Sequence, residues 1–291
     1  MARPRIALTT GDPAGIGPEI AAKAAADPRV RAVGDVVLYG PPDGFCAPVG
    51  RASAEGGQAA YELIVAAVAD ALAGRVDAIA TAPVNKEAFA LAGLPWRGHT
   101  ELLAHLTGAP SVAMMFHAEA LRVVLATIHV PLSEVPRLLT RDLLESIIRL
   151  SARELPRFGY PSPRLAVAGL NPHAGESGVL GREEGEVIEP VVAACRDGGI
   201  DVSGPFPADT LFARAARGEF DAVVACYHDQ GLIPVKLLAF GRAVNVTLGL
   251  PIVRTSVDHG TAFDIAGRGV ADHGSMVEAV LLAARLAAGA P

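Results

Sequence analysis

Short apolar runs alternate with longer helical patterns along nearly the whole chain, and this alternation constrains the fold most. Segments such as RIALTT, DAIATAPV and DAVVACYH are apolar throughout and short enough to be strands. Ala- and Leu-rich stretches such as ELIVAAVADALAG and SMVEAVLLAARLAA are typical of helices. Strands without polar alternation suit a sheet that helices cover on both faces. The sequence therefore predicts an α/β fold.

Length and composition limit the size and setting of this fold. A chain of 291 residues with 51% hydrophobic residues can bury one large core or two medium ones, in one or two closely packed domains. No apolar run approaches the roughly 20 residues that span a bilayer. The opening MARPRIALTTGDPAG enters a strand-like segment without the apolar region of a signal peptide. We expect a cytoplasmic protein with no membrane partner.

Charge and cysteine content point to a small-molecule partner. The net charge of −6 comes without Lys/Arg clusters, so the electrostatic footprint of a nucleic-acid-binding protein is missing. Cys46, Cys195 and Cys226 stand far apart and include no CxxC pair, which argues against disulfides and thiolate metal sites. We expect them to be small buried residues.

Histidines follow three of the predicted buried strands. LRVVLATIH ends in His129, RLAVAGLNPH in His173 and DAVVACYH in His228. Ligands of open α/β sheets bind outside the carboxyl ends of the strands, so three imidazoles could converge there. Such a set suits zinc or a neighbouring transition metal better than Mg or Ca. Each histidine could instead be a hydrogen-bonded loop or core residue, and the pattern alone leaves both interpretations open.

Two further segments could bind anions or cap helices. GDPAGIGPE follows the first predicted strand, and Pro18 suits the start of a helix, so the glycines shape a tight turn whose N–H groups could face an anion. The segment is neither GxGxxG nor a P-loop, and a purely structural turn is an equal alternative. GHTE indicates a helix start with Thr100 as a possible cap. The stretch from 40 to 57 has the composition of a loop.

A Lys, an amide and an Arg recur at nine-residue spacing in PVKLLAFGRAVNVTLGLPIVRTS. These residues are Lys236, Asn245 and Arg254. Their side chains are donor types that hold phosphate or carboxylate groups. Solvation at the surface is the alternative for each. It suits Arg254 least, because this residue follows an apolar run.

A set of ordered motifs over nearly the whole chain resembles the 4-hydroxythreonine-4-phosphate dehydrogenase family of the vitamin B6 route. Such a set is far more specific than any lone pattern. The motifs are TTGDPAGIGPE, TAPVNKEA, GHTELLA, LATIHVPL, GLNPHAGESGVLGREE, GPFPADTLF, YHDQGLIPVK, GRAVNVTLGLP and RTSVDHGTAFDIAGRG.

The resemblance implies roles for residues at matching positions. It implies that one divalent metal ion per subunit, zinc before Co, Mn or Mg, is bound by His129, His173 and His228. It also implies that a small phosphorylated hydroxy acid is the substrate. The substrate contacts that it implies are His99, Thr100, Lys236, Asn245 and Arg254.

DHGTAFDIAGRG also resembles the nucleotide-site segment of isocitrate and isopropylmalate dehydrogenases. This resemblance implies NAD or NADP around His259, Gly260, Asp264 and Gly267, without a Rossmann fingerprint. Asp264 could otherwise be an acid in a helical region. The implied fold is a two-domain α/β/α sandwich with the active site in the interdomain cleft. We expect residues 1–110 plus 262–291 in the first domain and 111–261, with the metal ligands and a homodimer interface, in the second.

The reaction that the resemblance implies is oxidation at C3 of 4-hydroxythreonine 4-phosphate, followed by decarboxylation to 3-amino-2-oxopropyl phosphate. Asp229, Lys86 or a water could take the hydroxyl proton. The same motifs occur in relatives that act on four-carbon sugar-acid phosphates or a terephthalate cis-dihydrodiol. Two hypotheses from other classes are a metal-dependent binding protein without redox chemistry and a three-histidine hydrolase. Family members are usually longer, and the shortfall is expected between Gly40 and Gln58.

Overall fold

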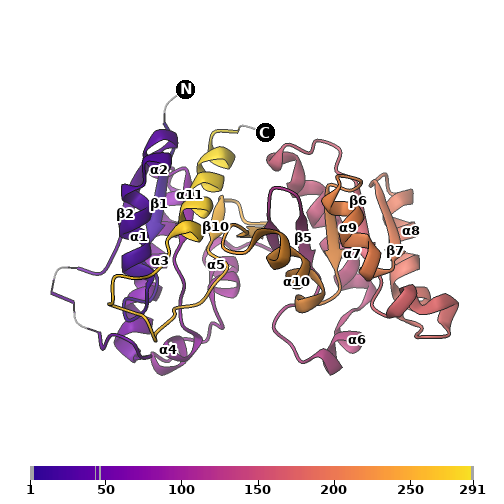
Figure 1. Cartoon of the computed structure of the whole chain (residues 1–291), viewed down its shortest axis with the longest axis horizontal. Helices are drawn as coiled ribbons and strands as arrows, with labels where there is room; N and C mark the ends of the chain where they lie inside the picture. Colours follow the sequence, from indigo (N-terminus) through magenta and orange to yellow (C-terminus); the bar gives the residue numbers. More distant parts are fainter. Residues whose placement is uncertain (1–2, 43, 46, 290–291) are drawn as a thin grey trace. The chain divides into compact units, whose positions relative to one another are not determined.

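The computed structural model describes residues 3–42, 44–45 and 47–289, and these form two compact units (Figure 1). Unit 1 comprises residues 1–112 and 244–290, and unit 2 essentially residues 113–243. The predicted boundary at 110/111 lies close to the first of these limits. The sequence predicts that the chain re-enters the first domain at residue 262. The structure places this boundary earlier, at 243/244, because β9 and β10 already belong to the sheet of unit 1.

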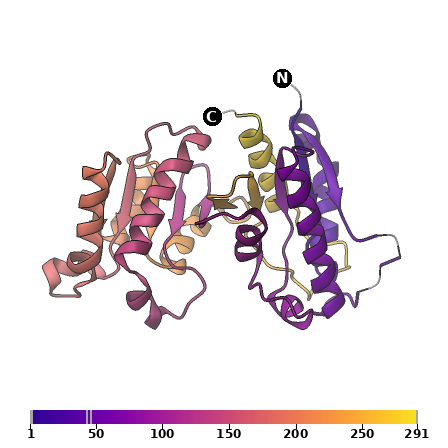
Figure 2. The ribbon, with the colours of Figure 1, turned by 180° about the vertical axis from the view of Figure 1, so that it is seen from behind.

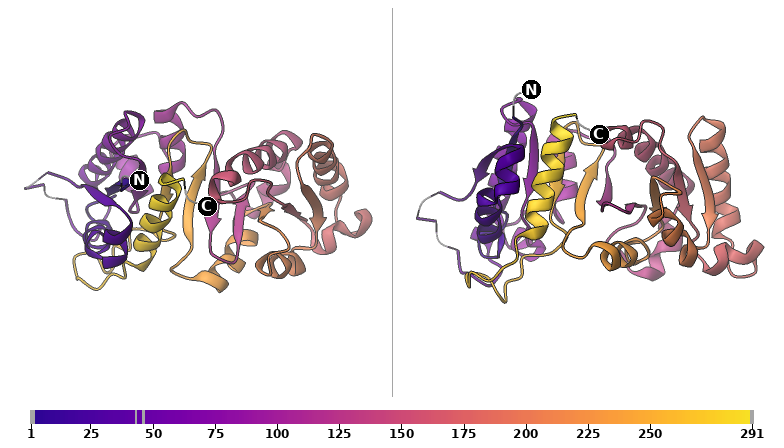
Figure 3. Two further views of the ribbon diagram at one scale, coloured as in Figure 1. Left: turned by 90° about the horizontal axis from the view of Figure 1, so that it is seen from above. Right: turned by 45° about the horizontal axis from the view of Figure 1, so that its top comes forward.

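Unit 1 is built on five strands in the order β2-β1-β3-β10-β9. All are parallel to their neighbours except β9, which runs antiparallel to β10. Two helical layers accompany the sheet: α1, α2 and α11 contact one another, and α3 contacts α4 and α5 (Figure 3). The strands are β1 (Arg5–Thr9), β2 (Asp35–Tyr39), β3 (Ala78–Thr81), β9 (Val244–Leu248) and β10 (Arg254–Ser256). The helices are α1 (Gly17–Ala26), α2 (Pro28–Val33), α3 (Ala54–Leu72), α4 (Lys86–Leu91), α5 (His99–Thr107) and α11 (Gly274–Ala287).

Unit 2 has the strand order β4-β5-β8-β6-β7. Only β4 is antiparallel to its neighbour in this set. Helices α7 and α8 pack together, while α9 and α10 contact the strands β8, β6 and β5 (Figures 1 and 2). The strands are β4 (Ala113–His117), β5 (Arg122–Leu125), β6 (Leu165–Ala168), β7 (Val202–Phe206) and β8 (Ala222–Ala225). The helices are α6 (Val135–Leu138), α7 (Arg141–Glu154), α8 (Glu189–Asp197), α9 (Ala208–Ala216) and α10 (His228–Ala239), with short helical turns at Leu132–Glu134, Leu155–Phe158, Pro172–Gly178 and Glu184–Ile188.

Local sequence explains where the longer helices begin. The Ser53 hydroxyl accepts a hydrogen bond from Gly56 N at 3.1 Å and caps α3. The predicted loop from 40 to 57 therefore ends earlier, because helix geometry starts at Ala54. Thr140 caps α7 in the same way. The α/β prediction is confirmed, and no helix within the described residues is long and apolar enough to cross a bilayer.

The GDPAGIGPE turn requires glycine at its two ends. Gly11 has φ +64°, and a Cβ there would lie 2.2 Å from the carbonyl oxygen of Pro83. A Cβ on Gly17 would lie 1.9 Å from the carbonyl oxygen of Thr10. The turn thus lets α1 start against the end of β1, as the sequence predicts. Cys195 and Cys226 are buried as expected, while Cys46 lies outside the described residues.

Candidate active site

The three strand-end histidines of unit 2 follow neighbouring parallel strands. The strands β5, β8 and β6 lie side by side, so their carboxyl ends share one edge of the sheet. His129, His228 and His173 each follow one of these ends within a few residues. The prediction that a histidine follows the carboxyl end of each of these buried strands is confirmed, whereas their role as metal ligands stays a prediction.

His129 and His228 lie together beside a pocket. Their ring centroids are 5.5 Å apart, with ring planes 44° from parallel. The pocket has a volume of about 330 Å³. It is lined by the segments 128–132 and 227–229 together with Val135. A small ligand that enters this pocket would meet both imidazoles.

Asp229 orients one of these imidazoles. Its Oδ1 lies 2.7 Å from Nδ1 of His228, which is the first residue of α10. A carboxylate at Nδ1 favours the tautomer in which Nδ1 carries the proton and Nε2 offers its lone pair. Such a contact is common behind histidines that bind metals. Asp229, predicted as a base candidate, thus has a contact that suits an orienting role.

His173 lies on an unusual turn. Five consecutive residues, 173–177, have left-handed backbone angles, with φ between +46° and +79°. Four of the five are not glycine. Each non-glycine residue in this region costs about 1–2 kcal/mol, so other contacts must hold the turn. We name residues 173–177 the left-handed turn.

The donor chemistry of these histidines fits a divalent transition metal, although one chain does not assemble the whole set. Two imidazoles bound to one tetrahedral zinc ion would have centroids about 5 Å apart, given Zn–N bonds of about 2.0–2.1 Å. The spacing of His129 and His228 is compatible with this. Among the described residues, no group of three or more His, Cys, Asp or Glu is close enough to hold an ion. His173 of the same chain therefore does not complete a three-residue site with the other two histidines.

Unit 1 contains a buried cationic group at the start of β10, next to β3. Arg254 is 2% exposed, so the alternative of a solvated surface residue does not apply. Its guanidinium donates to Thr247 Oγ1 at 2.9 Å and to Thr81 Oγ1 at 2.7 Å. A third nitrogen of the group, Nε, has no hydrogen-bond partner among the described residues. Burial lowers the pKa of Arg254 to about 9, so the group is still charged at neutral pH.

Two other predicted substrate contacts also have enclosed atoms without partners among the described residues. They are Nε2 of His99 and Oδ1 of Asn245. Burial and, to a lesser extent, the charge of Arg254 hold the pKa of His99 well below its usual value. The neutral imidazole can therefore accept a hydrogen bond from a substrate hydroxyl or donate one to an anion. A buried polar atom without a partner is costly, and a bound ligand would supply the missing bond.

The structure corrects the prediction of a cap at Thr100. Helix α5 begins at His99 with Gly98 as its N-cap, so Thr100 is the second helical residue. At the same helix start, Glu101 Oε2 accepts a hydrogen bond from Arg97 N at 2.8 Å. Lys86 is the first residue of α4, which follows β3 after four connecting residues, and Lys236 lies in α10 of unit 2.

The predicted cofactor residues lie in an irregular segment of unit 1. His259, Gly260, Asp264 and Gly267 lie outside the buried core, and Asp264 lies in a turn and not in a helix. Ala262 has φ +43°, a conformation that is uncommon for residues other than glycine. The GDPAGIGPE turn packs here, since Ile16 N donates to Thr261 O at 3.0 Å.

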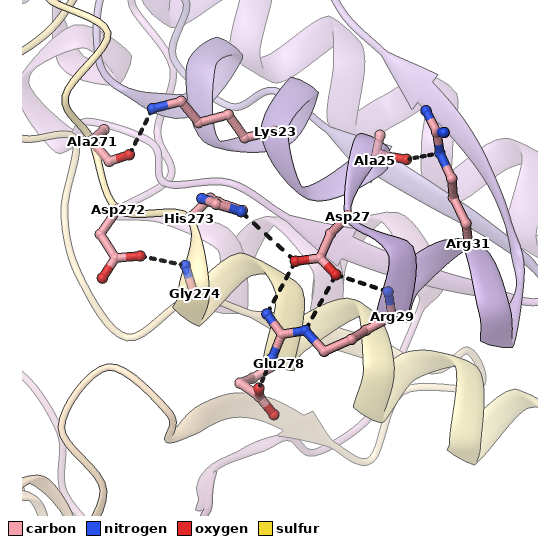
Figure 4. A network of polar contacts seen from close by, with 10 residues as sticks. All are labelled: Lys23, Ala25, Asp27, Arg29, Arg31, Ala271, Asp272, His273, Gly274 and Glu278. Carbon is pink, nitrogen blue, oxygen red and sulfur yellow. Dashed lines mark hydrogen bonds and ion pairs between the residues drawn. The ribbon is translucent and has the colours of Figure 1, made fainter.

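Helix α1 anchors the far end of this segment. Lys23 Nζ donates to the carbonyl oxygens of Gly269 and Ala271, each at 3.0 Å. Glu19 Oε1 accepts from Ala271 N at 2.9 Å. Figure 4 shows how this network continues to the start of α11, where His273 approaches Asp27. The segment is thus fixed at both ends while its middle stays accessible.

Sequence reasoning missed Thr81 and Thr247, the two hydroxyls that hold Arg254. Thr81 ends β3 in the motif TAPVNK, and Thr247 lies on β9. Buried threonines at strand ends near a predicted anion site were the available signal. Which strands would be neighbours could not be inferred from the sequence.

Relatives with this architecture are dehydrogenases. The chain is 46% identical to a 4-hydroxythreonine-4-phosphate dehydrogenase of Geobacter metallireducens over 325 aligned positions, which cover 98% of this chain and 96% of the relative. It is 45% identical to a D-threonate 4-phosphate dehydrogenase of Cupriavidus necator, with 98% and 97% covered. Both alignments are longer than the 291 residues of this chain, so these relatives have additional residues.

Solved structures that resemble this chain are also of dehydrogenases. A 4-hydroxythreonine-4-phosphate dehydrogenase from Klebsiella pneumoniae superposes with a TM-score of 0.89 at 43% identity, with 98% of each chain covered. A terephthalate 1,2-cis-dihydrodiol dehydrogenase from Burkholderia xenovorans gives 0.68 at 33% identity, covering 98% of this chain and 97% of that one.

The fold itself extends to more distant enzymes. Isocitrate dehydrogenase from Methylococcus capsulatus gives a TM-score of 0.53 at 20% identity, with 95% of this chain and 83% of that chain covered, which confirms the predicted fold class. Residues 17–283 match the family described as pyridoxal phosphate biosynthetic protein PdxA. A match of this extent, together with relatives near 46% identity, shows that the chain belongs to the PdxA family.

Proposed function

We propose that this dehydrogenase oxidises 4-hydroxythreonine 4-phosphate at C3, with NAD or NADP as hydride acceptor and a divalent metal ion held by histidines. The observation that carries the substrate class is the buried Arg254, whose Nε lacks a partner among the described residues, beside the unpartnered Nε2 of His99. A buried cation without a counterion favours an anionic ligand such as a phosphate or carboxylate. Family membership supplies the reaction type.

Each group has a distinct task in this proposal. Arg254, Asn245 and Lys236 bind the anionic parts of the substrate, and that binding energy orients C3. His99 and Thr100 bind its polar groups. Asp229 or Lys86, or a water, accepts the proton of the C3 hydroxyl as the hydride leaves C3 for the nicotinamide. The resulting β-keto acid loses CO2, and its electron pair passes to the adjacent carbonyl.

His129, His173 and His228 would hold the metal ion. When bound, the ion would acidify the substrate hydroxyl and stabilise the negative charge that develops during decarboxylation. The pairing of His228 with Asp229 supports this, because it leaves Nε2 as a ligand atom. The accessible stretch His259–Gly267 would receive the nicotinamide cofactor.

A homodimer would complete the metal site, with one histidine from a second copy. Large exposed apolar side chains follow each histidine in the sequence, which supports this proposal. They are Leu132 after His129, Val179 after His173, and Leu237 and Phe240 after His228, with Leu237 and Phe240 more than 80% exposed. Exposed apolar groups of this size are typical of surfaces that another chain covers.

Metal removal and substrate addition test the proposal together. The protein, stripped of metal, is assayed for nicotinamide reduction with 4-hydroxythreonine 4-phosphate and NAD+ or NADP+, before and after Zn, Co, Mn or Mg is restored. Activity that requires both metal and substrate is the expected result. Turnover without nicotinamide would favour a hydrolase, and cofactor binding without turnover by any metal would remove this substrate.

D-threonate 4-phosphate is the second candidate substrate. The relative named for it is 45% identical to this chain, and those named for 4-hydroxythreonine 4-phosphate are 45–48% identical. Both compounds carry a phosphate and a hydroxyl at the same relative positions of a four-carbon acid. A ratio of kcat/KM values for the two substrates decides between them, with a terephthalate cis-dihydrodiol as the unphosphorylated comparison.

A further inference from the structure

Gln230 joins two strand ends beneath the predicted metal ligands. It is the third residue of α10 and is buried at 9% exposure. Its Oε1 accepts from Cys226 N at 2.7 Å, and its Nε2 donates to Gly169 O at 2.7 Å. Cys226 directly follows β8 and Gly169 directly follows β6. One amide group therefore links the two segments that lead to His228 and His173.

This link lies just beyond the backbone hydrogen bonds that pair β6 with β8. The register between β6 and β8 ends with Val167 opposite Val224. After this point the two chain segments continue towards their histidines. Where the two loops begin, the side chain of Gln230 therefore provides the connection that backbone hydrogen bonds provide between β6 and β8.

The third strand is tied to the same point. Thr127 Oγ1 donates to Cys226 O at 2.7 Å, and Thr127 N donates to the same oxygen at 3.1 Å. Both backbone groups of Cys226 are therefore occupied, its N–H by Gln230 and its carbonyl by Thr127. Thr127 precedes His129 by two residues, and Cys226 precedes His228 by two.

A separate clamp holds the left-handed turn. Glu184 is 3% exposed, and its carboxylate accepts from Asn171 N at 2.7 Å and from Asn171 Nδ2 at 2.9 Å. A Cβ on Gly175 would lie 2.6 Å from Glu184 Oε2, so the turn closes tightly over this carboxylate. The clamp fixes the turn locally, while Gln230 fixes the start of its loop relative to β8.

We propose that Gln230 is a positioning residue. It holds the loop that carries His173 to the strand end that leads to His228, so that each ligand is placed for its own metal site, an inference that rests on the proposed metal-dependent function. Only a side chain with a donor and an acceptor at its tip can join an N–H group to a carbonyl in this way. A glutamine at this helix position often just caps the helix start. A cap alone would affect α10, whereas a bridge also holds the loop at 170–178.

Amide hydrogen exchange on the metal-free protein separates these two roles. Gln230→Met keeps the length of the side chain and removes both hydrogen bonds. We expect exchange at 170–178 and 226–230 to become faster by about ten-fold or more, because the bridge no longer opposes local opening. Ser151→Ala is the matched control, since it removes one buried hydrogen bond of unit 2, to Ile147 O within α7. Unchanged exchange at 170–178 in Gln230→Met would overturn the proposal.

Thr127→Val provides a variant with a milder defect, which keeps the test decisive if Gln230→Met does not fold. It removes only the Oγ1 contact to Cys226. The expected result is faster exchange at 127–131 and 226–230 with no change at 170–178. Faster exchange at 170–178 as well would show that the loops open together without a specific role for Gln230, and would overturn the proposal.

Cobalt binding supplies the spectroscopic readout. Wild-type protein is titrated with Co²⁺, and the visible absorption of the bound ion reports its ligand geometry. We expect Gln230→Met to bind Co²⁺ about 10–100-fold more weakly and with an altered spectrum, as for other supporting residues of metal sites. Ser151→Ala should match the wild type. If the wild type itself binds no Co²⁺, the metal-dependent function fails, while the exchange result still decides whether Gln230 bridges the loops.

Discussion

At the scale of single residues, the guanidinium of Arg254 makes contacts that a lysine ammonium could not make. Its Nη2 and Nη1 donate to Thr81 and Thr247, while Nε has no partner among the described residues and can donate to a ligand. Arg254→Lys retains the charge and loses the planar fork that makes these contacts simultaneously. We expect kcat/KM for the phosphorylated substrate to fall about ten-fold or more, since a lost charged hydrogen bond costs about 1.5–3 kcal/mol. Steady-state nicotinamide reduction measures this.

The control for this substitution is Arg75→Lys, at an exposed ion pair with Asp70. It should leave kcat/KM unchanged. Wild-type kinetics in Arg254→Lys would place this side chain outside the substrate site. Urea unfolding of each variant distinguishes a kinetic effect from a loss of folded protein.

A second residue-scale prediction concerns acid stability at Asp221, which precedes β8. Burial alone would raise the pKa of Asp221, but its hydrogen bonds from Arg164 N, Nε and Nη2 together hold that pKa below the ordinary value. Because the pKa is lower in the folded than in the unfolded protein, the ionised carboxylate stabilises the fold. This stabilisation is complete above the unfolded-state pKa of about 3.9 and is lost as the pH falls through the folded-state pKa. Asp221→Asn should therefore be less stable at pH 7 and 5 by about 1 kcal/mol, because Arg164 is half exposed and water screens the pair.

Urea unfolding at pH 7, 5, 4 and 3 tests this dependence. The difference between wild type and Asp221→Asn should stay constant from pH 7 to 5 and shrink below pH 4. A difference of the same size at pH 3 would mean that the carboxylate charge does not stabilise this corner of unit 2.

At the scale of elements, the approach of α10 to β5 depends on one glycine. A Cβ on Gly231 would lie 2.7 Å from both Leu125 Cδ2 and Val123 Cγ1, which are fully buried and cannot move aside freely. Gly231→Ala should destabilise the protein by about 1–3 kcal/mol through overpacking. It should also weaken metal binding, because the displaced helix carries His228 at its first position.

Gly185→Ala is the matched comparison, since a Cβ there meets nothing within 4 Å. Its stability should lie within about 1 kcal/mol of the wild type. Equal stabilities for the two variants in urea unfolding would contradict the close packing of α10 on β5.

Strands and turns also differ in how well they could be predicted from the sequence. The apolar runs before His129, His173 and His228 are buried strands, as predicted, because a parallel sheet imposes a strong local pattern. The sequence does not predict β10, which carries Arg254, because three residues leave almost no pattern. The left-handed turn of His173 is equally hidden, since only its contacts to Asn171 and Glu184 make that backbone acceptable. Neighbouring strands and side-chain bridges such as that of Gln230 depend on distant residues, and no local pattern encodes them.

At the scale of the whole molecule, we expect two copies of the chain to share each metal site. This follows from the three predicted ligands and from the exposed apolar side chains that follow them in the sequence. His129 and His228 lie together in one chain, but the described residues of that chain assemble no complete ligand set. A second copy would supply the missing histidine. Three variants, His129→Ala, His173→Ala and His228→Ala, should each be inactive alone.

Mixing these variants in pairs, after mild dissociation and reassociation, reveals which chain supplies each ligand. In a mixed dimer of two variants whose ligands come from different chains, one site carries both defects and the other is intact. Random pairing should then restore about a quarter of wild-type activity, because half of the dimers are mixed and each has one intact site of two. Two of the three pairs should recover, and the pair whose histidines share a chain should not. Recovery in none of them would place all three ligands in one chain, and the exposed apolar residues after each histidine would then need another explanation.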